Sequence, residues 1–476
     1  MKRIVIITGH GLLLLLLWAS TALSAATEET LRFGRFGTVT VYRQTPHPAQ
    51  VVLFVSGDGG WNQGVVDMAK ELSALDALVV GIDITHYLTE LRTGAESCSY
   101  PAADFEALSQ FVQKTLAFPT YVSPVLVGYS SGATLVYAAL VQAPPGTFRG
   151  AISLGFCPDL SLAKPLCRGH GLEWTADPKG KGYSFSPATT LQSPWIALQG
   201  TIDQVCDPAT TESYVRQVGQ STLVMLPKVG HGFSVERNWL PQLKDAFASL
   251  VATNTSTQAA APTAVAVQDL PLVEVPVQAS SSDTLAVILS GDGGWVSIDR
   301  ELGHLLAERG IPVIGLNSLQ YFWTRRTPDD ASADLARILR HYLTTWHKKN
   351  ALLIGYSLGA DVLPFMANRL PPELLSHVRV IALLGPEAAV DFEFHVTDWL
   401  GVVKRASALP VQPEVEKLQG LKLLCLYGTE EKESLCRHLD PQVVTAMSLA
   451  GGHHFAGNYQ AVADAILHAA TPTAPH

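Results

Sequence analysis

The second half of the chain alternates short, almost wholly apolar runs with amphipathic stretches. In one such stretch Ile298, Leu302, Leu305 and Leu306 recur at near-helical spacing. The pattern predicts strands at 284–291, 311–318 and 350–357 and helices at 298–309 and 334–347. Apolar strands separated by helices are typical of a parallel sheet covered on both faces, so the predicted fold class is α/β.

Three motifs occur twice, in the same order. SGDGGW begins at Ser56 and Ser290, GYSxG is centred on Ser130 and Ser357, and a Gly-His segment ending in Phe holds His231 or His453. The paired positions are 234, 227 and 222 residues apart. This spacing is far too long for a solenoid repeat, and it predicts two tandem copies of one domain, the second slightly shortened.

Composition divides the chain into four segments. Residues 1–26 have a basic start, an apolar stretch and small residues, which predicts a cleaved secretory signal peptide. Residues 252–268 are rich in Ala, Thr and Gln and nearly uncharged, as expected of a linker. The two domains are therefore predicted at 27–251 and 269–476, and 270–277 is predicted to be the first strand of the second domain.

Charge and cysteine content narrow the class of protein. The net charge of −9 disfavours a broad nucleic-acid-binding surface. Each copy holds an even number of cysteines, namely Cys98, Cys157, Cys167 and Cys206 in the first and Cys425 and Cys436 in the second. In an oxidising compartment this predicts disulfides within each domain, with three pairings open in the first copy. Neither a CxxC pair nor a His-rich cluster indicates a metal site.

Ser357 lies at the centre of GYSLG, between a predicted strand and a predicted helix. This context is typical of the nucleophile elbow of α/β-hydrolases, in which glycines permit a tight turn that exposes the serine hydroxyl. The chain is therefore predicted to contain two tandem α/β-hydrolase-like domains, each a mostly parallel sheet flanked by helices.

A base and an acid are expected after the nucleophile, in the order serine, acid, histidine. His453 is the preferred base because it aligns with His231, although His454 stays open as an alternative. Glu431 is the preferred acid because it stands three residues after Gly428, as Asp203 does after Gly200. The neighbouring carboxylates Glu430 and Asp440 also stay open.

An oxyanion hole requires backbone N–H groups near the nucleophile. Leu358, directly after Ser357, is expected to supply one. Gly293, Gly294 and Trp295 of the SGDGGW loop are the candidates for the other, and Asp292 is expected to hold this loop by local hydrogen bonds.

The first copy retains a parallel set of candidates, Ser130, Asp203 and His231, in the same order. This set predicts a second site in the first domain. Its motif is GYSSG, so that a second serine, Ser131, follows the nucleophile position.

An aromatic and basic segment follows the predicted strand at 311–318. Its residues Tyr321, Trp323, Arg325 and Arg326 are candidates for substrate binding, because arginine pairs with phosphodiesters and aromatic rings line acyl or glycerol paths. Ordinary aromatic packing with solvated arginines is the competing interpretation. An acidic stretch further on, with Glu387, Asp391 and Glu393, is a weaker candidate for receiving a cationic group.

The doubled SGDGGW, GYSxG and GHxF layout, together with YFWTRRTP and GYSLGADVLPF, resembles the bacterial AcvB/VirJ virulence-factor family over nearly the whole mature chain. The two-domain form is similar to AcvB, and the second copy alone resembles VirJ. The resemblance implies a periplasmic protein whose second domain hydrolyses aminoacyl-phosphatidylglycerol, typically the lysyl ester, at the membrane surface. It carries the catalytic serine and histidine onto Ser357 and His453, with neither cofactor nor metal.

The same resemblance implies a role in lipid homeostasis and virulence, with secreted virulence proteins as further partners. It also leaves two alternatives. One is a periplasmic adaptor or chaperone for type IV secretion substrates, with an inactive hydrolase fold. The other is an esterase or lipase that acts on other acyl esters.

Overall fold

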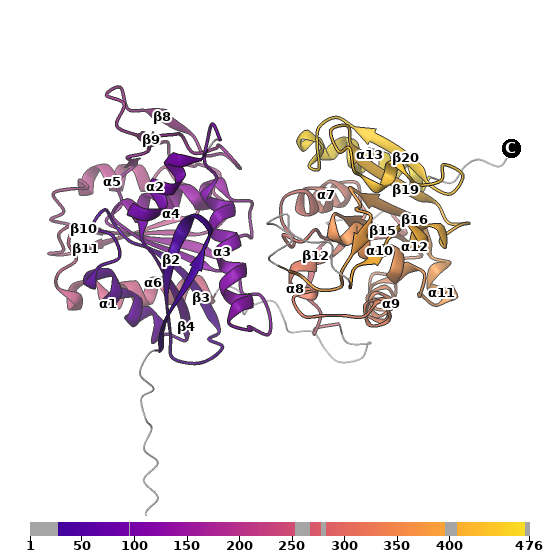
Figure 1. Ribbon diagram of the computed structural model, residues 1–476, viewed down its shortest axis with the longest axis horizontal. Coiled ribbons are helices and arrows are strands. Elements are labelled where there is room, and N and C mark those ends of the chain that lie inside the picture. The colour runs from indigo at the N-terminus through magenta and orange to yellow at the C-terminus, as the bar shows by residue number, and fades with distance from the viewer. Residues whose placement is uncertain (1–26, 95, 253–266, 278–281, 396–406, 472–476) are drawn as a thin grey trace, which may run out of the picture.

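The computed structural model describes residues 27–94, 96–252, 267–277, 282–395 and 407–471. The predicted signal peptide at 1–26 and most of the predicted linker at 252–268 lie outside the described residues. The described residues form two α/β domains that lie side by side (Figure 1). Within this part of the chain, none of the helices has both the length and the apolarity needed to cross a bilayer.

The N-terminal domain is built on an eight-stranded sheet in the order β1-β2-β4-β3-β5-β6-β10-β11. The strands are β1 Thr27–Phe33, β2 Gly37–Arg43, β3 Gln50–Val55, β4 Ala77–Ile82, β5 Val125–Tyr129, β6 Gly150–Leu154, β10 Trp195–Gly200 and β11 Ser221–Leu226. From β4 to β11 neighbouring strands run parallel, whereas β1 and β2 add an antiparallel edge. A small antiparallel sheet is formed by β7 Asp159–Leu160, β9 Tyr183–Phe185 and β8 Trp174–Ala176.

Helices cover both faces of this sheet. They are α1 Gln63–Ser73, α2 Ile84–Thr93, α3 Pro101–Thr115, α4 Ser131–Gln142, α5 Pro208–Val215 and α6 Leu240–Ala252. Residues of α1 and α6 pack in one core cluster, and residues of α2, α3, α4 and α5 pack in the other. Because both faces are buried, the central strands are apolar at nearly every position.

The C-terminal domain repeats this plan with a seven-stranded sheet in the order β12-β14-β13-β15-β16-β19-β20. The strands are β12 Leu272–Val275, β13 Thr284–Leu289, β14 Val313–Leu316, β15 Asn350–Tyr356, β16 Val378–Leu384, β19 Leu423–Gly428 and β20 Thr445–Leu449. The helices are α7 Ser297–Glu308, α8 Ser318–Tyr321, α9 Pro328–Thr345, α10 Leu358–Ala367, α11 Pro372–Leu375, α12 Gln412–Glu416 and α13 Tyr459–Ala470, and a short ladder joins β17 Ala389–Val390 to β18 Leu409–Pro410.

The sheets confirm the predicted α/β fold class, and the elements differ from prediction mainly at their ends. The first strand of the second domain is shorter than predicted and antiparallel to β14. Helix α9 begins at Pro328, six residues before the predicted start, and the Thr327 hydroxyl accepts the Asp330 N–H at 3.1 Å as its N-cap. Thr at the N-cap, Pro at the first position and two acidic residues in the first turn are the sequence signal for this start.

All six cysteines form disulfides within their own domain, which confirms that prediction. The pairs are Cys98–Cys167, Cys157–Cys206 and Cys425–Cys436. The last two pairs each restrain a loop that carries a candidate acid, since Asp203 lies just before Cys206 and Glu431 lies between Cys425 and Cys436.

Candidate active sites

The nucleophile position of the C-terminal domain is a strained turn between β15 and α10. Ser357 has φ 51° and ψ −119°, a left-handed conformation that is costly for a residue with a Cβ. A Cβ at Gly355 would lie 2.3 Å from the Gly359 oxygen, and one at Gly359 would lie 2.1 Å from the Leu289 oxygen. Only glycine fits at these two flanking positions, which is why the turn has the GxSxG sequence.

The imidazole of His453 is held in place by the carboxyl group of Glu431. Its Nδ1 lies 2.6 Å from Glu431 Oε1, and Glu431 Oε2 accepts the Gly428 N–H at 2.5 Å. A carboxylate on Nδ1 holds the proton there and leaves Nε2 as the basic nitrogen. The alternatives have other partners, since Tyr356 Oη lies 2.9 Å from His454 Nδ1 and Asp440 accepts the Gln442 N–H.

Ser357 and His453 line the same cavity, which has a volume of about 460 Å³. Among the hydrogen bonds of the described residues, none joins the Ser357 hydroxyl to the imidazole. The structure therefore brings the predicted nucleophile, base and acid to one place, with the hydroxyl not yet engaged. Such contacts commonly tighten only when substrate binds.

The SGDGGW loop and the start of α10 border this cavity. Leu358 is the first residue of α10, so its N–H precedes the intrahelical hydrogen bonds and is available to an oxyanion. Gly293 and Gly294 both line the cavity, and the N–H of Gly294 is donated to the Gly291 oxygen at 3.1 Å. The Gly294 amide therefore closes the tight turn, and an oxyanion role for Gly294 stays a prediction. The Trp295 ring packs over Gly315. Only the backbone N–H of Trp295 is therefore a candidate donor to an oxyanion.

The cavity has an acidic wall that is built by both domains. Asp292 and Asp299 come from the C-terminal domain, and Glu106 comes from α3 of the N-terminal domain. Asp299 is almost fully buried, and one of its oxygens has no hydrogen-bond partner in the part of the chain that the structure describes. Burial and the charge of Asp292 raise the pKa of Asp299 well above its usual range. The same two causes raise the pKa of Glu106 to about 8.

Sequence reasoning missed both Asp299 and Glu106. Asp299 stands in the first turn of α7, where an acidic residue is ordinarily explained by the helix dipole. Glu106 belongs to the other repeat, about 250 residues from Ser357, and no motif marks it. Only the packing of the two domains brings them together.

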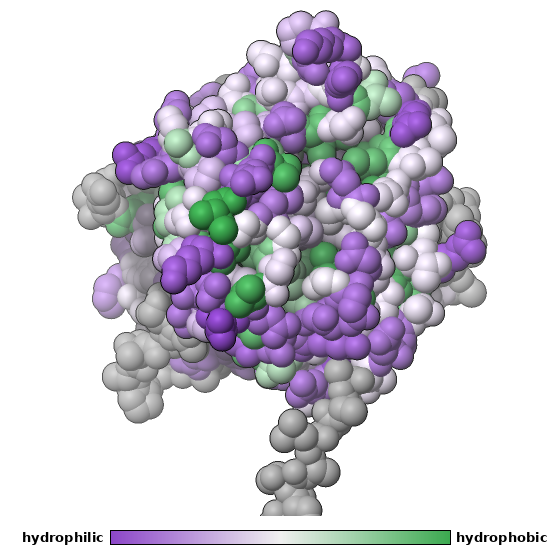
Figure 2. Space-filling view, turned by 90° about the vertical axis from the view of Figure 1, so that its left-hand side faces the viewer, coloured by the Kyte–Doolittle hydropathy of each residue, from purple (hydrophilic) through white to green (hydrophobic). Residues whose placement is uncertain are grey.

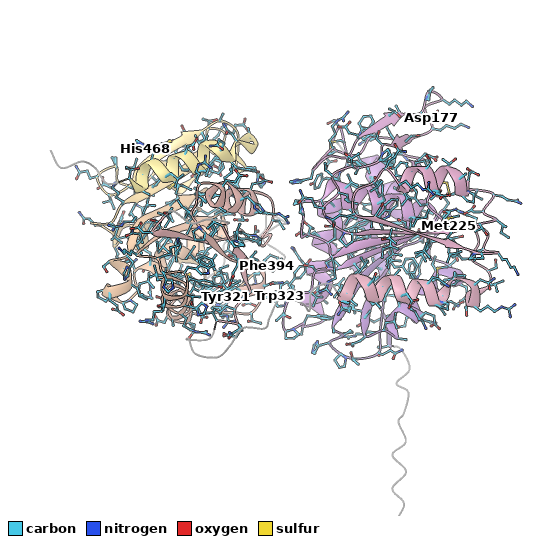
Figure 3. All side chains as sticks on the ribbon, turned by 180° about the vertical axis from the view of Figure 1, so that it is seen from behind. Asp177, Met225, Tyr321, Trp323, Phe394 and His468 are labelled. Carbon is cyan, nitrogen blue, oxygen red and sulfur yellow. A yellow bond between two sulfur atoms is a disulfide. The ribbon has the colours of Figure 1, made fainter. Side chains whose placement is uncertain are left out.

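The aromatic and basic segment lies at the interface between the domains, not in the cavity. Trp323 is buried, donates its indole N–H to the Phe118 oxygen at 2.7 Å and stacks on Phe394 at 5.7 Å. Lys114 of α3 lies 4.7 Å from the Trp323 ring centroid. Figure 3 shows Tyr321, Trp323 and Phe394 on the side of the C-terminal domain that adjoins the N-terminal domain. The competing interpretation, ordinary aromatic packing, therefore holds for Trp323.

The other members of this segment also have structural partners. Tyr321 donates to Asp334 at 2.6 Å, and the Arg326 guanidinium lies 4.8 Å from the Tyr321 ring centroid. Arg325 pairs with Asp391 at 3.3 Å and with Glu393 at 3.2 Å. The structure therefore does not bring the four candidate substrate-binding residues to the cavity, and two acids of the later stretch are already paired.

The N-terminal domain contains a closed arrangement of serine, histidine and acid. The Ser130 hydroxyl lies 2.9 Å from His231 Nε2, and His231 Nδ1 lies 2.9 Å from Asp203 Oδ2. Ser130 has φ 55° and ψ −122°, nearly the values of Ser357. The three candidates of the first copy therefore meet with serine hydrolase geometry.

Parts of the chain resemble proteins of known structure. A search of curated proteins gave no significant match. Among solved structures, the serine hydrolase XC6422 from Xanthomonas campestris is 23% identical, with 50% of this chain and 98% of that one covered and a TM-score of 0.30. The esterase Est2 from Thermogutta terrifontis is 16% identical, with 50% and 96% covered and a TM-score of 0.34.

The family comparison is more specific. The model of the bacterial virulence protein VirJ matches residues 49–153 and 283–473, which take in the SGDGGW and GYSxG motifs of both domains and His453. Both copies therefore match the same family model, and together the matched segments make up more than half of the chain. The chain belongs to the VirJ family of bacterial virulence proteins.

Proposed function

We propose that the C-terminal domain is a periplasmic serine hydrolase that cleaves the aminoacyl ester of aminoacyl-phosphatidylglycerol, with the lysyl ester as the principal substrate. Its products are the free amino acid and phosphatidylglycerol. The observation that carries the proposal is one cavity lined by Ser357, by His453 with Glu431 bonded to its Nδ1, and by the acidic wall.

The reaction follows from the roles of these groups. His453 Nε2 takes the proton of the Ser357 hydroxyl as its oxygen attacks the ester carbonyl, and Glu431 stabilises the imidazolium. The N–H groups of Leu358 and of the SGDGGW loop stabilise the oxyanion. His453 then protonates the departing glycerol oxygen of phosphatidylglycerol. Water attacks the aminoacyl-serine, with His453 again as base, and releases the amino acid.

The acidic wall favours a substrate whose acyl group carries a positive charge. An aminoacyl ester carries an ammonium group close to the scissile carbonyl, and a lysyl ester carries a second one at the end of its side chain. Asp292, Asp299 and Glu106 line the cavity with carboxyl groups, and burial and the charge of Asp292 raise the pKa values of Asp299 and Glu106. A bound cation relieves that crowding of like charges and gains electrostatic stabilisation.

The test is hydrolysis of lysyl-phosphatidylglycerol in mixed micelles by the purified full-length protein, with released lysine as the readout. We expect Ser357→Ala to lower kcat by about 10³-fold or more. Ser376→Ala, which changes an exposed serine of the same domain, is the matched control and should retain full activity. Full activity in Ser357→Ala would refute the proposal.

A further inference from the structure

We propose that the N-terminal domain is a second, independent active site, which hydrolyses carboxylic esters with an apolar acyl chain. The proposal goes beyond the function assigned to the C-terminal domain and does not depend on it. It rests on the closed Ser130–His231–Asp203 arrangement and on the exposed apolar side chains that accompany it.

The carboxyl group of Asp203 is held in place by several hydrogen-bond donors. Asp203 Oδ1 accepts the N–H groups of Val205 at 2.8 Å and Cys206 at 3.0 Å, and Oδ2 accepts the Gln199 amide at 3.1 Å as well as His231. The Asp203 carboxyl is fully buried. A buried carboxylate with this many donors orients the imidazole and stabilises its protonated form during catalysis.

The nucleophile side is equally well formed. The Ser130 backbone is held in its left-handed conformation because its N–H is donated to the Leu154 oxygen at 2.9 Å. Ser131 begins α4, so its N–H is directed at the position of an oxyanion, and its hydroxyl donates to Asp58 of the SGDGGW loop at 2.7 Å. A Cβ at Gly57 would lie 2.9 Å from Ser130 Cβ, so this loop passes directly beside the nucleophile.

A metal site is the competing interpretation, because Asp203, Cys206 and His231 cluster closely enough to hold an ion. Two observations argue against it. Cys206 is bonded to Cys157, and a disulfide offers no thiolate ligand. Both ring nitrogens of His231 are already engaged, one by Ser130 and the other by Asp203. The geometry is therefore that of a hydrolytic triad.

Apolar side chains are exposed on the two loops that carry the acid and the base. Ile202 and Val205 flank Asp203 with 60% and 67% exposure, and Val235 follows His231 with 45%. We call these three residues the apolar rim. The other large apolar side chains exposed in the described chain, Leu409 and Met447, belong to the C-terminal domain. Exposed apolar side chains on the loops that carry the acid and the base are expected where an apolar ligand binds.

The rim lies at the free end of the molecule. Gly146, which precedes β6, packs against Trp295 of the C-terminal domain, so the amino ends of the parallel strands adjoin the interface. Ser130, Asp203 and His231 follow the carboxyl ends of β5, β10 and β11, at the opposite edge. Figure 2 looks onto this outer end, where β10 and β11 lie in Figure 1, and shows apolar areas between polar ones.

The chemistry balances without a further reactant. The Ser130 oxygen attacks the ester carbonyl while its proton passes to His231 Nε2. The bond to the alcohol oxygen breaks, and His231 returns the proton to the leaving alcohol. Water then attacks the acyl-serine, its proton passes through His231 to Ser130, and the fatty acid is released.

The first test isolates this site in the full-length Ser357→Ala protein. We expect a fluorophosphonate probe to label Ser130, as identified by peptide mass spectrometry, and p-nitrophenyl octanoate to be hydrolysed. Adding Ser130→Ala or, separately, His231→Asn should lower kcat/KM by about 10³-fold. The absence of label on Ser130 together with unchanged octanoate hydrolysis in both variants would overturn the proposal.

The second test addresses the acyl chain, in the same background. Replacing Ile202, Val205 and Val235 by Ser should lower the ratio of kcat/KM for p-nitrophenyl octanoate to that for p-nitrophenyl acetate by about tenfold, because the longer chain loses apolar contact. The matched control carries Leu409→Ser and Met447→Ser and should keep the parental ratio. An unchanged ratio in the rim variant would overturn the assignment of an apolar acyl group.

Discussion

The two domains carry the same arrangement of serine, histidine and acid in different surroundings. Both nucleophiles have φ near 50°, and in both domains a tyrosine next to the nucleophile donates to the backbone oxygen of the base, at 2.9 Å for Tyr129 and 3.4 Å for Tyr356. The N-terminal site opens at the free end of the molecule beside apolar side chains. The C-terminal site faces the amino edge of the first domain, which adds Glu106 to its wall.

A duplicated domain can thus acquire a different specificity without new catalytic groups. The geometry around serine, histidine and acid depends on local sequence, namely a strand, a glycine-flanked turn and a late loop. The residues around each site depend on which edge of its sheet faces the other domain. The first domain therefore has two roles in our proposals, as a hydrolase at one edge and as a wall of the second site at the other.

The largest expected effects come from the two acids. Glu431→Gln should lower the hydrolysis of lysyl-phosphatidylglycerol by about 10³-fold, and Asp203→Asn should do the same to octanoate hydrolysis at Ser130, because an amide does not stabilise the imidazolium. Kinetics with both substrates on both variants would measure this. A loss of both activities in either single variant would contradict two independent sites.

The next largest effect is expected from a substitution at the interface between the two domains. Trp323→Ala removes a buried ring that bonds to Phe118 and packs on Tyr121. We expect about a tenfold loss of kcat/KM with lysyl-phosphatidylglycerol, since the wall that carries Glu106 shifts, and little change at Ser130. Trp346→Ala, which changes a tryptophan beside Tyr342 in α9, is the matched control. Equal losses of both activities in Trp323→Ala would contradict a role confined to the interface.

The sequence predicts the arrangement of serine, histidine and acid but not the interface between the domains, for a physical reason. Ser357, His453 and Glu431 belong to motifs whose local chain geometry recurs, so their meeting followed from the order of elements. The cavity wall follows from packing between residues about 250 positions apart, and no local pattern encodes such packing. The positions of Tyr321 and Trp323 could not be predicted for the same reason. An aromatic segment has the same sequence pattern whether it contacts a ligand or a neighbouring domain.

A smaller effect is expected from the charge that the first domain contributes. Glu106→Gln should raise KM for the lysyl ester by about fivefold and leave kcat unchanged. Because the pKa of Glu106 is raised to about 8, the carboxyl ionises as pH rises through that value. The KM advantage of the wild type should therefore grow between pH 7 and pH 9, in which range the lysyl ε-ammonium stays charged. A ratio of KM values that is independent of pH would contradict this role.

The last effect is on stability and comes from the same carboxyl group. Its pKa is raised from 4.5 to about 8 in the folded protein, so the folded state binds this proton more tightly than the unfolded state does. That contribution favours folding below about pH 4.5 and is lost as pH rises towards 8. Since Gln does not ionise, Glu106→Gln should match the wild type in Tm near pH 4, exceed it increasingly up to pH 8 and differ by a constant amount above. Glu308→Gln, at an exposed position of the C-terminal domain, is the matched control and should show no such trend in calorimetry across this range.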